Sequence, residues 1–188
     1  MLFRSGLEET ALAEAALARL GDVLPHDRAE VFVRSASGAL LPVARTPESA
    51  ASWRPSTTSG IWGDAWESGA AQQRLGAMSG PELGTSTACA VIPLRLGDER
   101  VGLVGLERSG GLWPIADLSE AQLMADEAAL RLDTARLFDE VRDLATLEER
   151  RRLAREIHDG IAQEVAGLGF LVDRSEEHTS ELQSRVDI

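Results

Sequence analysis

Cysteine, long apolar runs and positive charge are all scarce in this chain of 188 residues. The single cysteine, Cys89, excludes an internal disulfide framework and fits a reducing cytoplasm. A transmembrane helix needs about 18 consecutive apolar residues; no such run exists, and charges occur throughout residues 1–22, unlike a signal peptide. The 19 basic and 31 acidic residues give a formal charge of −12, which argues against direct nucleic-acid binding. We therefore expect a cytoplasmic protein with no membrane segment in the printed sequence.

The first 142 residues are typical of an α+β domain. Apolar residues make up 44% of the chain, enough for one buried core with residues left over for a helical extension. Helix-forming residues predict a helix at 7–20. Short strands are predicted at 31–34 and 40–44, where Pro42 indicates an edge position or a bulge.

A short helix and a weak strand are predicted after the Ser-, Thr- and Pro-rich loop 45–60. The helix covers residues 61–67, and the strand covers residues 72–78. Trp62 and Trp66 lie four residues apart in this helix. Such a pair either lines a ligand pocket or belongs to the core and the pocket rim, and we favour the second interpretation.

The clearest β pattern is an antiparallel hairpin formed by residues 88–96 and 101–107 around the polar turn G-D-E-R. Gly102 and Gly105 could be taken for a nucleotide-binding loop. They lie inside a strand pattern with no helix N-terminus after them, so we reject that interpretation.

A long helix is predicted from Ser119, with Ser119 and Gln122 as a capping box. No Pro or Gly interrupts residues 118–159, a length that favours a signalling coiled coil. After Leu144 the apolar register shifts, which is where a coiled coil can adopt two packings. The apolar positions before this shift are Leu123, Leu130, Leu137, Val141 and Leu144.

The stretch E-E-R-R-R-L-A-R-E-I-H-D-G-I-A-Q-E-V, residues 148–165, continues the helical pattern and contains the candidate reactive residues. His158 lies one position from an apolar stripe, with Asp159 next to it and Gln163 one turn beyond Asp159. A neutral imidazole is a good nucleophile near pH 7. An adjacent carboxylate can accept the ring proton, and a carboxylate with an amide can orient a water for hydrolysis. The stripe consists of Leu147, Ala154, Ile157, Ile161, Leu168 and Leu171.

Residues 149–165 resemble the phosphoacceptor and dimerisation helix of sensor histidine kinases of the HisKA-type-three subfamily. The resemblance implies that His158 receives the phosphoryl group from ATP, with Asp159 as the acid/base. It implies that Asp159 and Gln163 together dephosphorylate the partner regulator. It also implies a homodimer, a response regulator with a helix-turn-helix output domain, and ATP and Mg²⁺ held by an ATP-binding domain of the same parent protein.

The order of elements before residue 142, with I-P-L before the hairpin turn and G-L-V-G-L-E after it, resembles a GAF domain. The family implies a six-stranded antiparallel sheet with helices on one face and a small-molecule pocket on the other. Some relatives bind haem, bilin or cyclic nucleotide. Haem needs an axial ligand, and the only histidine in this region, His26, lies in a predicted loop. Cys89 lies inside a strand pattern, as a small buried hydrophobe rather than a bilin attachment site. An apolar or aromatic ligand, or none, remains open.

We expect three segments: a GAF-like sensor at 1–142, a signalling helix with the first phosphoacceptor helix at 143–173, and a non-native or disordered tail at 174–188. Residues 174–184 resemble a translated sequencing adapter, so His178 has no assigned role. We expect the second dimerisation helix and the ATP-binding domain to lie outside these residues. The helical dimerisation domain is then truncated, and the fragment alone is inactive as a kinase.

Two other functions fit the same residues. The chain could be a non-catalytic GAF module that binds a ligand, dimerises and docks its helix on another protein. It could also be a dedicated phosphatase of the regulator that uses Asp159 and Gln163.

Overall fold

The computed structural model describes residues 5–78 and 86–186, with side chains over 8–78, 86–158 and at Ile161. Contacts divide the chain into two compact units, Met1–Asp139 and Glu140–Ile188.

One antiparallel sheet forms the centre of the first unit. Its order is β2-β1-β5-β4-β3, so β5 lies in the middle. The described residues contain five strands, whereas the GAF resemblance implies six. The predicted α+β class is confirmed, and so is the β4–β5 hairpin. The strands are β1 (Arg28–Arg34), β2 (Leu40–Thr46), β3 (Gln72–Leu75), β4 (Thr87–Leu96) and β5 (Glu99–Ser109).

Pro42 lies on an edge strand and at a bulge, as its position in the sequence predicts. Among the described strands, β2 pairs only with β1, and the register shifts between the pairs Val31–Ala44 and Phe32–Pro42. Proline has no backbone N–H for a strand ladder, so an edge strand with a bulge accommodates it.

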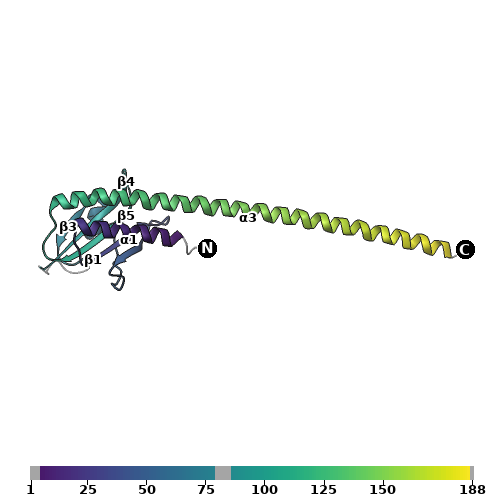
Figure 1. Ribbon diagram of the computed structural model, residues 1–188, viewed down its shortest axis with the longest axis horizontal. Coiled ribbons are helices and arrows are strands. Elements are labelled where there is room, and N and C mark those ends of the chain that lie inside the picture. Colours follow the sequence, from purple (N-terminus) through teal and green to yellow (C-terminus); the bar gives the residue numbers. More distant parts are fainter. Residues whose placement is uncertain (1–4, 79–85, 187–188) are drawn as a thin grey trace. The chain divides into compact units, whose positions relative to one another are not determined.

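Helices α1 (Ser5–Val23) and α3 (Ile115–Val186) cover one face of the sheet, α3 with its first part (Figure 1). The main core lies between these helices and the sheet. The residues of α3 in this core are mostly alanines, and Ala121, Ala125 and Ala129 are fully buried. The larger residues predicted as a stripe, such as Leu123 and Leu130, are instead exposed on α3.

The start of α3 differs from the prediction. The helix begins at Ile115, directly after Pro114, and the Leu118 N–H donates to the Pro114 carbonyl. Ser119 therefore lies inside the helix, where its hydroxyl donates to the Ile115 carbonyl four residues earlier. The predicted capping box of Ser119 and Gln122 is wrong, because Gln122 turns toward the sheet and donates to the Pro93 carbonyl.

The opposite face of the sheet carries helix α2 (Gly60–Ser68) and a second, smaller core. Glu30, Phe32 and Arg34 alternate along β1 with the residues of the main core. This alternation is that of a strand with two covered faces.

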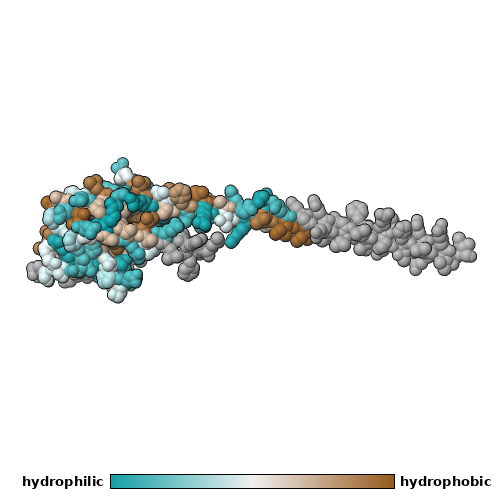
Figure 2. Space-filling view, viewed as in Figure 1, coloured by the Kyte–Doolittle hydropathy of each residue, from teal (hydrophilic) through white to brown (hydrophobic). Residues whose placement is uncertain are grey.

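The second unit consists of the later part of α3, and its described side chains are exposed except for that of Thr146, which is half-buried. Apolar side chains lie at the surface along α3, including those of Leu144, Leu147 and Ile157. Figure 2 shows brown patches along this helix. Within the residues described, no helix is both long and apolar enough to cross a membrane.

Candidate sensor face and phosphoacceptor helix

Tryptophan rings fill the α2 face of the sheet. Trp62 of α2 meets the Phe32 ring edge-on, with centroids 5.5 Å apart and planes at 86°. The Trp53 ring lies 6.1 Å from that of Trp62. Both tryptophans are buried, and Trp66 packs at the margin of this cluster. The interpretation of Trp62 and Trp66 as core and rim agrees with this packing.

Gly105 of β5 is the point where these rings touch the sheet. A Cβ atom at this position would lie 2.4 Å from Trp62 Cη2 and 3.1 Å from Trp53 Cζ3. Both rings therefore pack directly on the strand backbone. Gly102 is equally confined, because a Cβ there would lie 2.2 Å from the Phe32 carbonyl oxygen. These glycines serve close packing inside a strand, which agrees with the rejection of a nucleotide loop.

A buried carboxylate holds the Trp53 loop against β1. Glu30 is 1% exposed, and it accepts hydrogen bonds from the Ser52 hydroxyl at 2.5 Å and the Trp53 N–H at 2.8 Å. Arg45 of β2 lies 4.0 Å from the same carboxylate. Buried charge is costly unless it is paired and hydrogen-bonded, and these three groups satisfy that condition. Glu30 is therefore the anchor that places Trp53 over the sheet.

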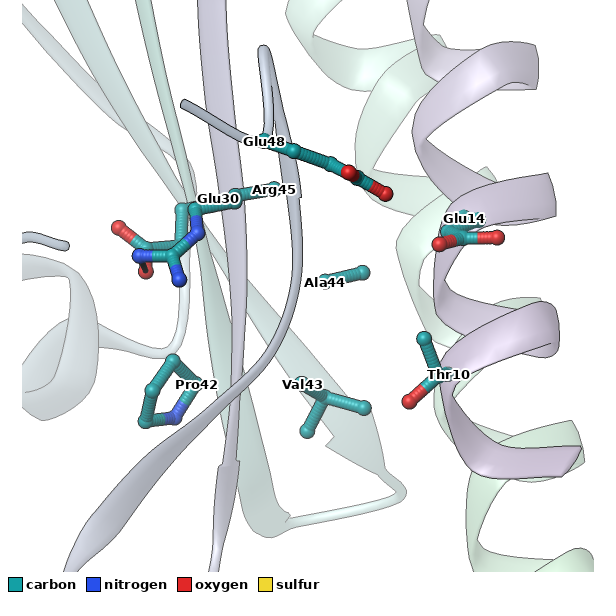
Figure 3. A pocket seen from close by; sticks show the side chains of 8 residues that line it. All are labelled: Thr10, Glu14, Glu30, Pro42, Val43, Ala44, Arg45 and Glu48. Atoms are coloured by element: carbon teal, nitrogen blue, oxygen red, sulfur yellow. Dashed lines mark ion pairs between the residues drawn. The ribbon is translucent and has the colours of Figure 1, made fainter. Parts of the chain in front are cut away.

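A groove runs along the edge of the sheet between α1 and β2. One part has a volume of about 310 Å³, and Glu14 and Glu48 face the gap from opposite walls (Figure 3). Its lining residues are Thr10, Glu14, Glu30, Pro42, Val43, Ala44, Arg45 and Glu48. None of these lining residues belongs to the aromatic cluster, although Glu30 accepts the hydrogen bond from the Trp53 N–H of that cluster. Glu14 and Glu48 are exposed, and no group of three or more metal-ligating side chains occurs in the described part of the chain.

The two residues weighed as haem or bilin ligands have local roles. His26 lies in the loop between α1 and β1, and its Nδ1 is 2.8 Å from the Leu24 carbonyl oxygen. Cys89 is fully buried in the smaller core, and this burial raises the pKa of its thiol. A buried, protonated thiol is a poor nucleophile, so Cys89 serves packing.

His158 lies on α3 with its side chain exposed. Arg152, six residues before His158, forms ion pairs with Glu149 at 2.8 Å and with Glu156 at 3.3 Å. The pair with Glu156 is the one that the spacing of four residues predicts. Asp159 and Gln163 belong to the same helix, and their side chains lie outside the described residues. The three predicted site residues thus lie within six consecutive residues of one helix, with His158 next to Asp159 and Gln163 about one turn after Asp159.

One group of interacting residues in the first unit gave no signal in the sequence. Arg95, at the end of β4, donates both to Asp126 of α3 and to the Gly69 carbonyl after α2. An arginine near a hairpin turn is ordinarily a solvated side chain. Its partners lie 26 and 31 residues away, so only the folded chain identifies them.

Residues 149–187 match the sequence model of a family described as histidine kinase, in the HisKA-type-three group. No curated protein sequence matches the chain. Among solved structures, the second GAF domain of DevS from Mycobacterium smegmatis aligns with a TM-score of 0.56 at 21% identity, over 71% of this chain and 99% of that chain.

Two further solved structures show the same fold in different proteins. The GAF domain of a two-component sensor histidine kinase from Bacillus halodurans gives a TM-score of 0.55 at 17% identity, covering 69% of this chain and 96% of that one. A type II free methionine-R-sulfoxide reductase from Thermoplasma acidophilum gives 0.55 at 19%, covering 68% and 94%. One fold thus occurs in a sensor and an enzyme, so the fold alone decides neither ligand nor activity.

The chain combines a GAF fold with a segment similar to the HisKA-type-three histidine kinases, and both resemblances are confirmed. The family match and helix α3 both extend past residue 174. The interpretation of 174–184 as a translated adapter stays a prediction.

Proposed function

We propose that this chain is the sensor part of a two-component histidine kinase, in which the GAF domain controls autophosphorylation of His158 and phosphotransfer to a response regulator. The match of residues 149–187 to the histidine kinase family carries the proposal. Two further facts support it: the exposed side chain of His158, and the continuity of α3 from Ile115 to Val186.

The chemistry assigned to this chain concerns three residues. The neutral imidazole of His158 attacks the γ-phosphorus of ATP with one ring nitrogen, the bond to the leaving ADP breaks, and Asp159 accepts the proton from the other nitrogen. Asp159 and Gln163 orient a water when the regulator is dephosphorylated. ATP with Mg²⁺, held by a domain outside these residues, supplies the phosphoryl group and the charge stabilisation that phosphoryl transfer needs.

The proposal includes a cytoplasmic homodimer built along α3. Leu123, Leu130, Leu137 and Leu144 repeat every seven residues, and all four are exposed. A heptad repeat of leucines is the pattern of a coiled-coil seam. The register changes between Leu144 and Leu147, so the GAF state could favour one of two packings of the helices and thereby present His158 to the kinase domain or to the regulator.

The test is phosphorylation of the product of the whole gene that encodes this chain, with His158→Gln and His26→Gln compared. Radiolabelled ATP should label the parent protein and the His26→Gln variant with an acid-labile, alkali-stable phosphate. The His158→Gln variant should acquire no label while its dimer, measured by sedimentation, stays intact. Labelling of His158→Gln at the parent level would overturn the assignment.

The same assay separates the two other functions. A non-catalytic GAF module would show no labelling in any variant. A dedicated phosphatase would show no autophosphorylation, even in the parent protein. Its activity toward the phosphorylated regulator would be lost entirely in the Gln163→Ala variant. A kinase with Gln163→Ala should retain autophosphorylation of His158 and lose regulator dephosphorylation.

A further inference from the structure

The hairpin β4–β5 contacts the C-terminal end of α2 through two arginines. Arg95 Nη1 donates to the Gly69 carbonyl at 2.8 Å, and Arg100 Nη2 donates to the Glu67 carbonyl at 2.9 Å. Gly69 ends α2 in the left-handed conformation, with φ of 64° and its N–H bonded to the Ala65 carbonyl. Both guanidinium groups therefore lie where a helix C-terminus exposes carbonyl oxygens, which favours positive charge.

Arg95 alone of these two arginines also binds α3. Its Nε and Nη2 donate to Asp126 at 3.0 and 2.6 Å, a bidentate ion pair, and both side chains are half-buried. Gln122, one turn earlier on α3, donates to Asp126 and to the Pro93 carbonyl of β4. The two acceptors of Arg100 in the described residues, in Asp98 and Glu67, belong to the hairpin and to α2.

The two helices lie on opposite faces of the sheet, so Arg95 joins them around the hairpin. On one face, α2 carries Trp62 and Trp66 of the aromatic cluster. On the other, α3 packs its alanines against the main core. The Arg95–Asp126 pair adds positional specificity to this packing, because a planar guanidinium fits a carboxylate in one bidentate geometry.

We propose that Arg95 is the positioning residue that couples α2 to α3, so that a displacement of α2 on the aromatic face changes the stability of α3 at Asp126. The regulatory meaning of this coupling rests on the proposed function, because α3 is the helix that contains His158. The coupling itself is a property of the first unit. Under this proposal Arg95 transmits a displacement of α2 to α3, whereas Arg100 only stabilises the end of α2.

Hydrogen exchange of backbone amides in the 188-residue chain tests the coupling. Arg95→Met should speed exchange at the end of α2 and at residues 122–129 of α3 by about tenfold or more, the effect expected when a charge-assisted hydrogen bond is lost. The matched variant Arg100→Met, which keeps the Arg95–Asp126 pair, should speed exchange at the end of α2 and affect residues 122–129 much less than Arg95→Met does. Equal effects of the two variants on α3 would overturn the proposal.

A second comparison tests transmission from the aromatic face. Trp66→Ala loosens α2 at the half-buried margin of the cluster. In the chain with Arg95, this change should also speed exchange at residues 122–129. In the Arg95→Met background, Trp66→Ala should add nothing there. An undiminished response of α3 without Arg95 would place the coupling elsewhere and overturn the assignment.

Asp126→Asn provides the same test if Arg95→Met does not fold, because it removes the charge and keeps the size of the side chain. It should abolish the response of α3 to Trp66→Ala, and a retained response counts against the proposal. The exchange measurements are repeated with His158→Gln, which should leave them unchanged. A failed kinase assignment would leave the exchange pattern intact, whereas a failed coupling would leave phosphorylation of His158 intact, so the two failures are distinguishable.

Discussion

Replacing Gly105 with alanine should destabilise the first unit by about 1–3 kcal/mol, the usual cost of overpacking a well-filled core. The new Cβ would lie 2.4 Å from Trp62 Cη2, about 1 Å inside ordinary van der Waals contact, and 3.1–3.2 Å from two atoms of Trp53. Trp62 cannot simply retreat, because its other side meets the Phe32 ring. We expect a cost near the upper end of the range.

The assay is equilibrium unfolding followed by tryptophan fluorescence, with Gly111→Ala as the matched control. Gly111 has open space around its position, so alanine there changes only the backbone entropy of the unfolded chain. At this domain size each kcal/mol corresponds to about 2–4 °C in Tm. Gly105→Ala should therefore melt at a clearly lower temperature than Gly111→Ala.

Trp62→Phe identifies the responsible contact, because a phenyl ring lacks the outer indole atoms that approach Gly105. In the Trp62→Phe background, the loss of unfolding free energy caused by Gly105→Ala should fall by more than half. A double-mutant cycle of the two substitutions measures this difference. If Gly105→Ala were as stable as Gly111→Ala, the rings would not pack on the strand as described. The α2 face would then have spare room, as a small-molecule pocket requires.

Two further predictions concern pH and assembly. The Ser109 N–H donates to the Asp27 carboxylate at 2.6 Å, and this hydrogen bond lowers the pKa of the carboxyl. The ionised Asp27 therefore stabilises the folded state fully above the pKa of the unfolded chain, about 3.9. This stabilisation is lost as the pH falls below that value. In urea unfolding, the stability gap between the parent and Asp27→Asn should therefore be constant from pH 7 to about 5 and close below about 4; a gap that widens in acid would refute the sign. Leu137→Lys should raise the Kd of the α3 homodimer at least about tenfold in sedimentation experiments, since burying a leucine contributes about 1.5–3 kcal/mol. An unchanged Kd would place the dimer interface elsewhere.

Local patterns predicted the elements whose information lies close together in the chain. The β4–β5 hairpin follows from two apolar runs around a polar turn. The edge position of Pro42 follows from its missing N–H. The continuity of α3 follows from the lack of Pro and Gly through residues 118–159. Each of these outcomes depends on backbone chemistry within a few residues, so tertiary context does not reverse it.

The start of α3 shows where local reasoning fails. Ser119 and Gln122 satisfy the capping-box spacing, yet the helix begins at Ile115, and the Gln122 amide donates to the Pro93 carbonyl of β4. A cap is worth about 1 kcal/mol. Burying Leu118 and the alanine face of α3 contributes more than that, and those residues are buried only because the sheet is there.

The sequence by itself determined the α+β class of the first unit, the continuity of α3 and the placement of His158 on that helix. These features depend on periodicity and on a contiguous motif. Only the tertiary structure decided which apolar residues of α3 face the sheet, that tryptophans fill the α2 face at Gly105, and that Arg95 joins α2 to α3. Those features depend on side chains that are tens of residues apart and meet when the sheet assembles, so no local pattern records them.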